Sequence, residues 1–266
     1  MRTPDWRYAA EQAAAWLYPR RCPFCGAVLG TDAVQGSVCP QCVEEEERLT
    51  HNPPRLPGTE HTFYALNSGL AAYYYSGKVQ EAILLCKRGF HPWYARELAD
   101  RMAVRIWGAT PPDRPGRRPK NELFRDMPLY QCIVPVPPHQ PLPGVPGLPL
   151  LLARRLGILL EIPVETPLYA VRGTAVQKDL TRQQRMQNAR KAYACRTDAD
   201  LGGKRVLLVD DIITTGATVS ACAMLLLKAG AVEVTAAAVA ASEELPKDKR
   251  TSTETVSYTH LTLPTT

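Results

Sequence analysis

The residue types best suited to chemistry lie in one stretch, Val206-Leu-Leu-Val-Asp-Asp-Ile-Ile-Thr-Thr-Gly-Ala-Thr218. Its apolar start is typical of a buried strand, which would place Asp210 and Asp211 at a sheet edge, where open α/β folds bind ligands. The loop after the acids would offer backbone N–H groups and hydroxyls at a helix N-terminus, which suits a phosphate. This loop consists of Thr214, Thr215, Gly216, Ala217 and Thr218.

Two adjacent carboxylates would repel a phosphate unless they contact hydroxyl groups or a divalent cation. The stretch therefore predicts a ligand that carries a sugar diol as well as a phosphate, such as a ribose 5-phosphate. A buried strand followed by an ordinary helix cap is the alternative. That alternative explains threonine near the turn, but it does not explain two consecutive acids followed by Thr-Thr-Gly-x-Thr.

Four cysteines form a second pattern, Cys22-Pro-Phe-Cys25 and Cys39-Pro-Gln-Cys42. Each C-x-x-C pair can hold one cation, and two pairs complete the tetrahedral shell that zinc prefers. A redox pair or four unrelated buried thiols are the alternatives. A shell of four cysteines has no open position for water or substrate, so we expect a structural Zn²⁺. The acidic run 44–47 that follows argues against direct DNA binding by this module.

The composition indicates a globular protein of ordinary type. The 266 residues include 45% hydrophobic ones, and 32 Lys+Arg stand against 26 Asp+Glu, which excludes disordered and fibrous classes. The positive charges are scattered, so charge alone does not indicate a partner. No apolar run is long enough to cross a bilayer, and the N-terminus lacks a signal-peptide pattern. We therefore expect a cytoplasmic protein without membrane insertion.

The elements that must position these residues follow from periodicity. A helical pattern covers about 78–107, and a Pro- and Arg-rich stretch at 108–120 predicts an exposed loop. Short β-rich runs then alternate with helical ones, which predicts a parallel sheet with crossover helices. The expected strands are 132–136, 164–169, 192–195, 206–209 and 232–239, and the expected helices are 150–160 and 217–229.

Three parts of the chain are expected. Residues 1–60 would form an N-terminal helix, the zinc-ribbon module and a linker, and residues 61–241 the sheet domain. The tail 242–266 becomes Thr-rich, has no periodicity and looks like sequencing-adapter read-through. We predict that it is non-native or disordered.

The stretch around Asp210 resembles the phosphoribosyl-diphosphate motif of type I phosphoribosyltransferases: four apolar residues, two acids, two apolar residues, Thr-Thr-Gly, a small residue and Thr. Together with the doubled C-x-x-C, the chain resembles the ComF family of competence-associated proteins from about residue 20 to 241. The resemblance includes Tyr75-Ser-Gly77 before a helix with Lys87, and Val134-Pro-Val-Pro137. It also includes the pattern Gln177-x-x-Leu180-x-x-x-x-Arg185-x-x-Asn188, which is followed by Ala192-Tyr193.

The resemblance implies an α/β fold: a type I phosphoribosyltransferase-like parallel sheet flanked by helices and preceded by a small zinc ribbon. It further implies transfer of ribosyl phosphate from phosphoribosyl diphosphate to an unidentified acceptor, with Asp210 and Asp211 as catalytic residues and Mg²⁺ bridging diphosphate and ribose. A mobile segment would close over the site. Its candidate residues are Arg172, Gln177, Arg185 and Asn188.

The same resemblance supports a second hypothesis, in which the chain is a non-catalytic accessory protein in competence, DNA uptake or DNA processing. Such a protein would bind nucleotides or single-stranded DNA and contact DNA-uptake proteins. A magnesium-dependent release of diphosphate would favour the enzyme, whereas steeply salt-dependent DNA binding would favour the accessory protein.

One loop departs from the family pattern. Relatives carry basic residues after the Val-Pro-Val-Pro element, but residues 138–149 contain five prolines and no Lys or Arg. Such a loop cannot offset the charge of diphosphate except through backbone N–H groups, several of which proline removes. Either catalysis is lost, or a local reading-frame error has replaced the family loop, which resequencing of the gene segment would reveal.

Overall fold

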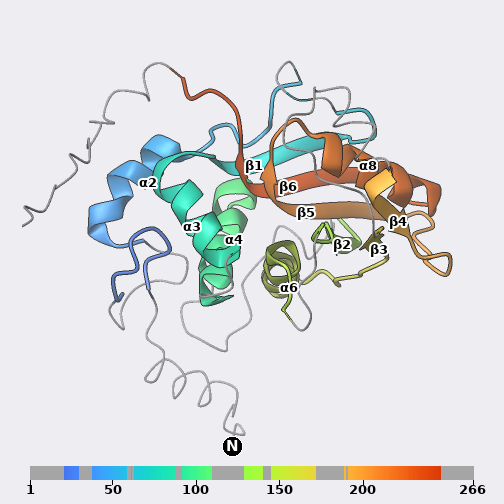
Figure 1. Ribbon diagram of the computed structural model, residues 1–266, viewed down its shortest axis with the longest axis horizontal. Coiled ribbons are helices and arrows are strands. Elements are labelled where there is room, and N and C mark those ends of the chain that lie inside the picture. The colour runs from blue at the N-terminus through green and yellow to red at the C-terminus, as the bar shows by residue number, and fades with distance from the viewer. Residues whose placement is uncertain are drawn as a thin grey trace, which may run out of the picture.

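The computed structural model describes residues 21–29, 38–58, 61, 63–87, 92–109, 129–139, 145–171, 189 and 191–246. Its centre is a four-stranded sheet with the strand order β1-β6-β5-β2 (Figure 1). Each neighbouring pair in this sheet is parallel. The strands are β1 (Ser68–Tyr74), β2 (Cys132–Pro135), β5 (Arg205–Ile213) and β6 (Glu233–Ala241).

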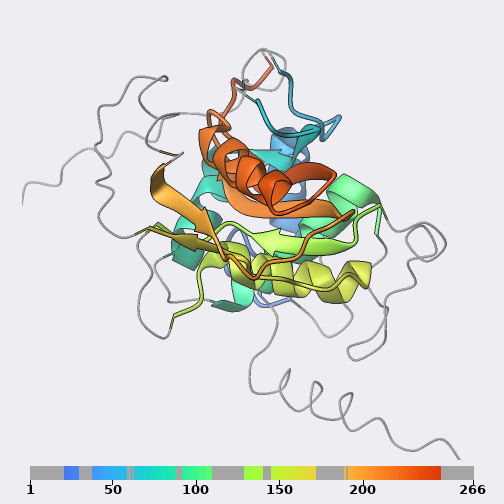
Figure 2. The same ribbon diagram turned by 90° about the vertical axis from the view of Figure 1, so that its right-hand side faces the viewer.

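Helices cover both faces of the sheet. The helices α4 (Pro92–Trp107) and α6 (Leu148–Leu160) lie on one face and α8 (Ala217–Lys228) lies on the other, as Figure 2 shows. Leu207 and Val209 of β5 belong to the core beneath α4 and α6, whereas Val206 and Leu208 belong to the core beneath α8. Because both faces are covered, residues 206–209 of β5 are all apolar.

The remaining elements pack around this three-layer body. The 3-10 helix η1 (Pro40–Cys42) and the helix α2 (Val43–Leu49) form the N-terminal module with residues 21–29, and α3 (Gly77–Lys87) follows β1. The short strands β3 (Leu168–Ala170) and β4 (Tyr193–Cys195) pair antiparallel in a sheet of their own. Segment 50–56 runs along the free edge of β1, where Thr50 and Arg55 form bridges.

The predicted parallel sheet with flanking helices is confirmed, but the strands expected at 164–169 and 192–195 lie outside it and pair antiparallel as β3 and β4. Two further differences concern the bounds of elements. The helical pattern at 78–107 is divided into α3 and α4. The expected strand 164–169 shortens to β3, because Pro163 and Pro167 lack the N–H groups that a longer ladder needs. Val164 keeps only an isolated parallel bridge to Ile133.

The strand β1 was not expected from the sequence. It reads SGLAAYY, which shows no clean alternation of apolar and polar residues. It becomes a strand because β6 supplies its ladder on one side and its last four residues are buried. A tertiary partner of this kind outweighs local propensity.

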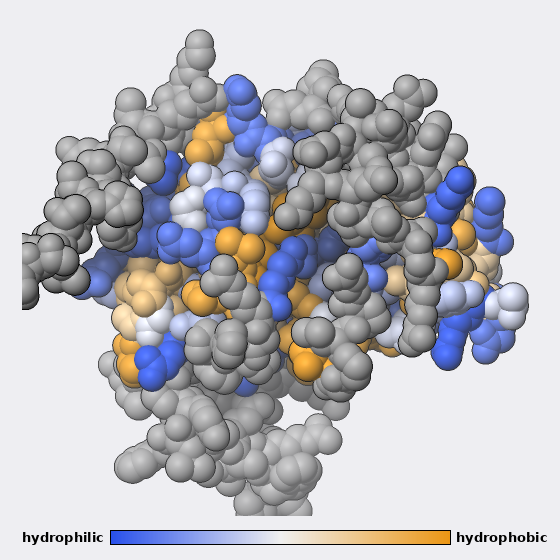
Figure 3. All heavy atoms as spheres, viewed as in Figure 1, coloured by the Kyte–Doolittle hydropathy of each residue, from blue (hydrophilic) through white to orange (hydrophobic). Residues whose placement is uncertain are grey.

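The surface shown in Figure 3 mixes hydrophilic and apolar residues among those drawn in colour. Within the described part of the chain, no helix is both long enough and apolar enough to cross a membrane.

Candidate functional site

The strand β5 carries the two acids to the carboxyl edge of the sheet. It ends at Ile213, and α8 begins four residues later at Ala217. The turn between them depends on Gly216, whose φ of 80° is a left-handed conformation that residues with a Cβ rarely adopt. The Thr215 hydroxyl accepts the N–H of Ala217 at 3.4 Å. The first turn of α8 therefore faces the same edge as the acids.

The two acids have different surroundings. Asp210 is 9% exposed, and its Oδ1 accepts the backbone N–H of Asp211 at 2.8 Å. The carboxylate of Asp211 lies 3.0 Å from the ammonium nitrogen of Lys87, which comes from the end of α3. Burial, and then the negative charge of Asp211, raise the pKa of Asp210 to about 8. A raised pKa of this kind is typical of functional sites.

This raised pKa predicts a pH-dependent cost to stability. Below pH 3.8, Asp210 is neutral whether the chain is folded or unfolded. Between that pH and about 8, the unfolded chain has released the proton that the folded protein retains, so stability falls as pH rises through this window. We expect Asp210→Asn to be more stable than the wild type at pH 8, and we expect this gain in the free energy of unfolding to shrink at pH 5.

Urea denaturation at both pH values, without divalent cations, measures this difference. The exposed Asp198→Asn is the matched control and should behave like the wild type at each pH. If Asp210→Asn raises the free energy of unfolding by the same amount at pH 5 and at pH 8, the raised pKa of Asp210 is not the cause of the gain.

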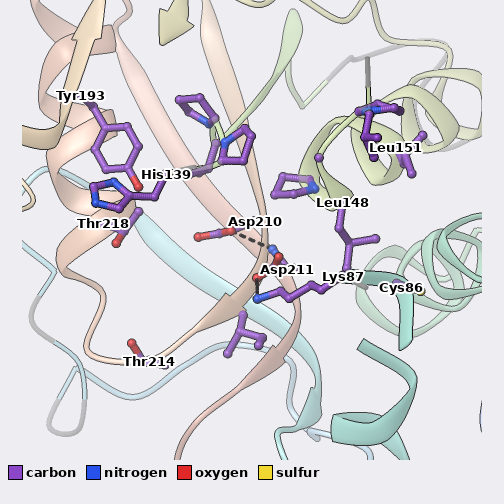
Figure 4. A pocket seen from close by; sticks show the side chains of 18 residues that line it. Cys86, Lys87, His139, Leu148, Leu151, Tyr193, Asp210, Asp211, Thr214 and Thr218 are labelled. Carbon is purple, nitrogen blue, oxygen red and sulfur yellow. Dashed lines mark hydrogen bonds and ion pairs between the residues drawn. The ribbon is translucent and has the colours of Figure 1, made fainter. Parts of the chain in front are cut away.

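A pocket of about 660 Å³ opens in front of the acids. Its walls come from five segments that are distant in sequence: the end of α3, residues 136–139 after β2, residues 145–151 at the start of α6, Tyr193 of β4, and the end of β5 with the loop after it. Figure 4 shows these side chains around Asp210 and Asp211. The pocket therefore collects the carboxyl ends of β2 and β5, as parallel α/β folds do at their ligand sites.

One wall of the pocket carries a tyrosine and a histidine. The ring of Tyr193 lies 6.4 Å from that of His139, and its hydroxyl hydrogen-bonds Thr218 in the first turn of α8. Burial raises the pKa of Tyr193, so the hydroxyl stays protonated at neutral pH. In Figure 4, Tyr193, His139 and Thr218 lie together on the side of the acids away from Lys87.

The structure brings together much of the predicted site. Asp210, Asp211, Thr214 and Thr218 all line the pocket. Of the other loop residues, Gly216 forms the turn, Thr215 accepts the Ala217 N–H, and Ala217 begins α8. The mobile-segment candidates lie outside the described residues, so their roles stay predictions. They are Arg172, Gln177, Arg185 and Asn188.

The sequence patterns did not indicate site roles for Lys87, Cys86, Tyr193 or His139. Each belongs to a segment whose position in front of β5 depends on the tertiary fold. One feature could have indicated a role for Lys87: it is the basic residue in the last turn of α3, and this helix directly follows a strand of the sheet.

The four cysteines of the N-terminal module converge on one point. Their Sγ atoms all lie within 4.8 Å of one another, and those of Cys25 and Cys39 are 3.4 Å apart. Four thiolates bound to zinc at about 2.3 Å would be separated by about 3.8 Å in a tetrahedron, so the cluster fits such an ion. The cluster could therefore hold a metal ion.

Local backbone structure produces this convergence. Gly26 takes a φ of 73°, which lets its N–H reach the Cys22 carbonyl at 2.9 Å. In the second knuckle, the N–H of Cys42 binds the Cys39 carbonyl at 2.9 Å. These two tight turns direct the thiols of each pair to the same side.

The N-terminal module packs directly against the sheet domain. Phe24, between the first two cysteines, meets the ring of Tyr73 of β1 edge to face, with centroids 5.9 Å apart. The Tyr73 hydroxyl donates to the buried carboxylate of Glu46 in α2 at 2.5 Å, and Arg101 of α4 donates to the same carboxylate at 2.6 Å. The module and the sheet thus share one core.

Parts of the chain are similar in sequence to known proteins. The family described as "Phosphoribosyl transferase domain" matches residues 147–261. The DNA utilization protein YhgH of Escherichia coli K12 is 40% identical over 63 residues, which are 24% of this chain and 27% of that protein. Competence protein F of Haemophilus influenzae is 35% identical over 86 residues, or 32% of this chain and 38% of that protein. The chain therefore spans well under half the length of these relatives.

Solved structures show weaker likeness. The glutamine phosphoribosylpyrophosphate amidotransferase of Bacillus subtilis has a TM-score of 0.29 and 24% identity, covering 43% of this chain and 23% of that one. The purine phosphoribosyltransferase of Pyrococcus horikoshii has a TM-score of 0.28 and 22% identity, covering 44% and 67%.

The sequence matches each cover less than half of the chain. The family match covers β5, the two acids at its end and α8. The chain carries a phosphoribosyl transferase domain and is homologous to competence protein F and the DNA utilization protein YhgH.

Proposed function

We propose that the pocket binds phosphoribosyl diphosphate, or a nucleotide with a ribose 5-phosphate, and transfers the ribosyl phosphate to an acceptor. The observation that carries this proposal is the convergence of Asp210, Asp211 and the first turn of α8 on one pocket. The match to the phosphoribosyl transferase domain, which includes this stretch, supports it.

Each part of the ligand has a partner of suitable chemistry. The 5-phosphate would lie at the N-terminus of α8, where backbone N–H groups and the hydroxyls of Thr214 and Thr218 are donors. The ribose hydroxyls would donate to Asp210 and Asp211. Carboxylate oxygens are also the ligands that magnesium prefers, so this pair fits Mg²⁺, which would offset the charge of the diphosphate.

In the proposed transfer, the bond between C1 and the diphosphate oxygen breaks and its electron pair leaves with diphosphate. A lone pair of the acceptor forms the new bond to C1, and the acceptor loses a proton where it carries one. Donors of the pocket, among them backbone N–H groups, would stabilise the departing charge. The apolar wall formed by Val145, Leu148 and Leu151 helps to exclude water, the competing nucleophile.

Diphosphate release tests the reaction. Incubation of the protein with phosphoribosyl diphosphate, magnesium and a panel of purine, pyrimidine and amine acceptors should release diphosphate with at least one of them. The Asp210→Asn/Asp211→Asn variant should release about 100-fold less, since it loses the charged contacts to ribose and cation. Equal release by both proteins would contradict the assignment of these acids.

We propose in addition that the four-cysteine cluster holds a structural Zn²⁺. All four ligands are protein thiols, which leaves no open coordination position. Such a site requires reduced cysteines, which fits a cytoplasmic location.

A second candidate function is an accessory role in DNA uptake or processing. The observation that favours it is homology to a competence protein and to a DNA utilization protein. In this case the pocket would bind a nucleotide or the end of a single strand. Fluorescence anisotropy with a single-stranded oligonucleotide at several salt concentrations tests it, because phosphate contacts make log Kd rise with log salt. Tight, salt-dependent binding without diphosphate release would favour this role over transfer.

A further inference from the structure

We infer that Lys87 is the residue that binds the diphosphate of the ligand, and that it leaves Asp211 to do so. This inference rests on the proposed function of the pocket and assigns the phosphate-binding charge within it. The loop at 138–149 has no Lys or Arg, so a cationic side chain for the diphosphate would have to come from another segment.

The position of Lys87 meets this need. It is the last residue of α3, lines the pocket, and reaches toward the acids at the end of β5 (Figure 4). Its ammonium nitrogen lies 3.0 Å from Asp211 Oδ1. The side chain is 41% exposed, so an incoming ligand can reach it without any unfolding.

The charge balance of the pocket points to the same residue. Two carboxyl groups face the cavity, and among the described lining residues Lys87 alone carries a fixed positive charge. A diphosphate brings several negative charges into this space beside the carboxylate of Asp211, and their mutual repulsion needs an opposing cation. Lysine suits the task because its ammonium is a compact charge on a flexible stem that can move between partners.

The helix that carries Lys87 is fixed at its other end. Near the start of α3, the ammonium of Lys78 lies 3.3 Å from Glu45 Oε2 and 3.6 Å from the thiol of Cys42. The apolar face of the helix is buried through Val79, Ala82 and Ile83. Only the stem of Lys87 therefore has to move, while its Cα stays in place.

The move of Lys87 from Asp211 to the diphosphate has a second effect. In the free protein, the ion pair occupies Asp211 and part of its hydrogen-bonding capacity. When Lys87 turns to the diphosphate, Asp211 becomes free to accept from a ribose hydroxyl or to contact a divalent cation. Diphosphate binding and ribose binding are thereby coupled through one side chain.

The test compares two ligands that differ in the diphosphate. Phosphoribosyl diphosphate and ribose 5-phosphate are titrated calorimetrically, with magnesium, into the wild type, Lys87→Met, Lys87→Arg and Lys228→Met. A lost charge-assisted contact should weaken binding of phosphoribosyl diphosphate to Lys87→Met by about 30-fold. Binding of ribose 5-phosphate should not weaken, because its phosphate lies at α8 and the loss of Lys87 leaves Asp211 free to accept from a ribose hydroxyl. Lys87→Arg should retain most of the affinity.

Lys228 is the matched control, since it is exposed at the far end of α8 and its loss changes net charge equally. Lys228→Met should bind both ligands like the wild type. A Lys87→Met variant with an unchanged ratio of the two affinities would overturn the assignment of Lys87 while leaving the proposed function intact. A wild type that binds neither ligand would overturn the proposed function, and the role of Lys87 with it.

Discussion

Removal of the proposed Zn²⁺ from the four-cysteine cluster is expected to lower the melting temperature by about 10 °C, because the cluster belongs to the same core as the sheet domain. Cys22 and Cys42 are almost fully buried, and they pack with residues of α3 and α4. Binding energy at a structural zinc site is folding energy. A loss of about 3 kcal/mol corresponds to a shift of this size in a domain of about 200 residues.

Thermal unfolding followed by circular dichroism, before and after chelation and after return of zinc, measures the effect. Cys42→Ser should reproduce the chelated state, and added zinc should not rescue it. Cys195→Ser is the matched control, since Cys195 is partly exposed and lies in β4 far along the chain from the cluster. A purified protein that contains no zinc, and whose Cys42→Ser variant melts at the wild-type temperature, would contradict the metal site.

Glu46→Ala is expected to destabilise the protein by about 3 to 5 kcal/mol, the range for breaking a buried ion pair by removing one partner. The Glu46 side chain is 2% exposed, and it accepts from Tyr73 and Arg101, while Arg105 lies 3.4 Å away. Its loss leaves the Arg101 guanidinium, whose side chain is only 12% exposed, without its main counter-charge.

Glu47→Ala is the control that the chain itself provides. Glu47 is the neighbouring residue of α2 and also pairs with Arg105, but its side chain is 58% exposed. A surface pair of this kind is worth about 0 to 1 kcal/mol. Urea denaturation of both variants measures the two values. If Glu46→Ala and Glu47→Ala lower the free energy of unfolding equally, Glu46 does not join the N-terminal module to the sheet as the structure indicates.

The sequence was most informative where one local pattern contains the whole chemistry. The run from Val206 to Thr218 holds a buried strand, two acids and a glycine turn in order, so its position at the sheet edge could be predicted. The spacing of the cysteines likewise predicted the cluster. In both cases the residues that act together are close in sequence or repeat a known ligand spacing.

The rest of the site depends on contacts between distant segments. Lys87 and Asp211 are an ion pair only because α3 ends in front of β5. Tyr193 reaches Thr218 because β4 packs near the start of α8. The strand β1 exists because β6 pairs with it, which no local propensity in SGLAAYY reveals. Such features follow from topology, and a single sequence contains no direct record of them.

The central claim is that the acids at the end of β5 form a phosphoribosyl site, and one titration tests it most directly. Phosphoribosyl diphosphate is titrated calorimetrically into the wild type, with and without magnesium, and into Asp210→Asn/Asp211→Asn. The exposed variant Asp198→Asn serves as the control for a lost carboxylate. We predict binding that requires magnesium and disappears in the double variant alone. A wild type that does not bind, or a double variant that binds equally well, would contradict the claim.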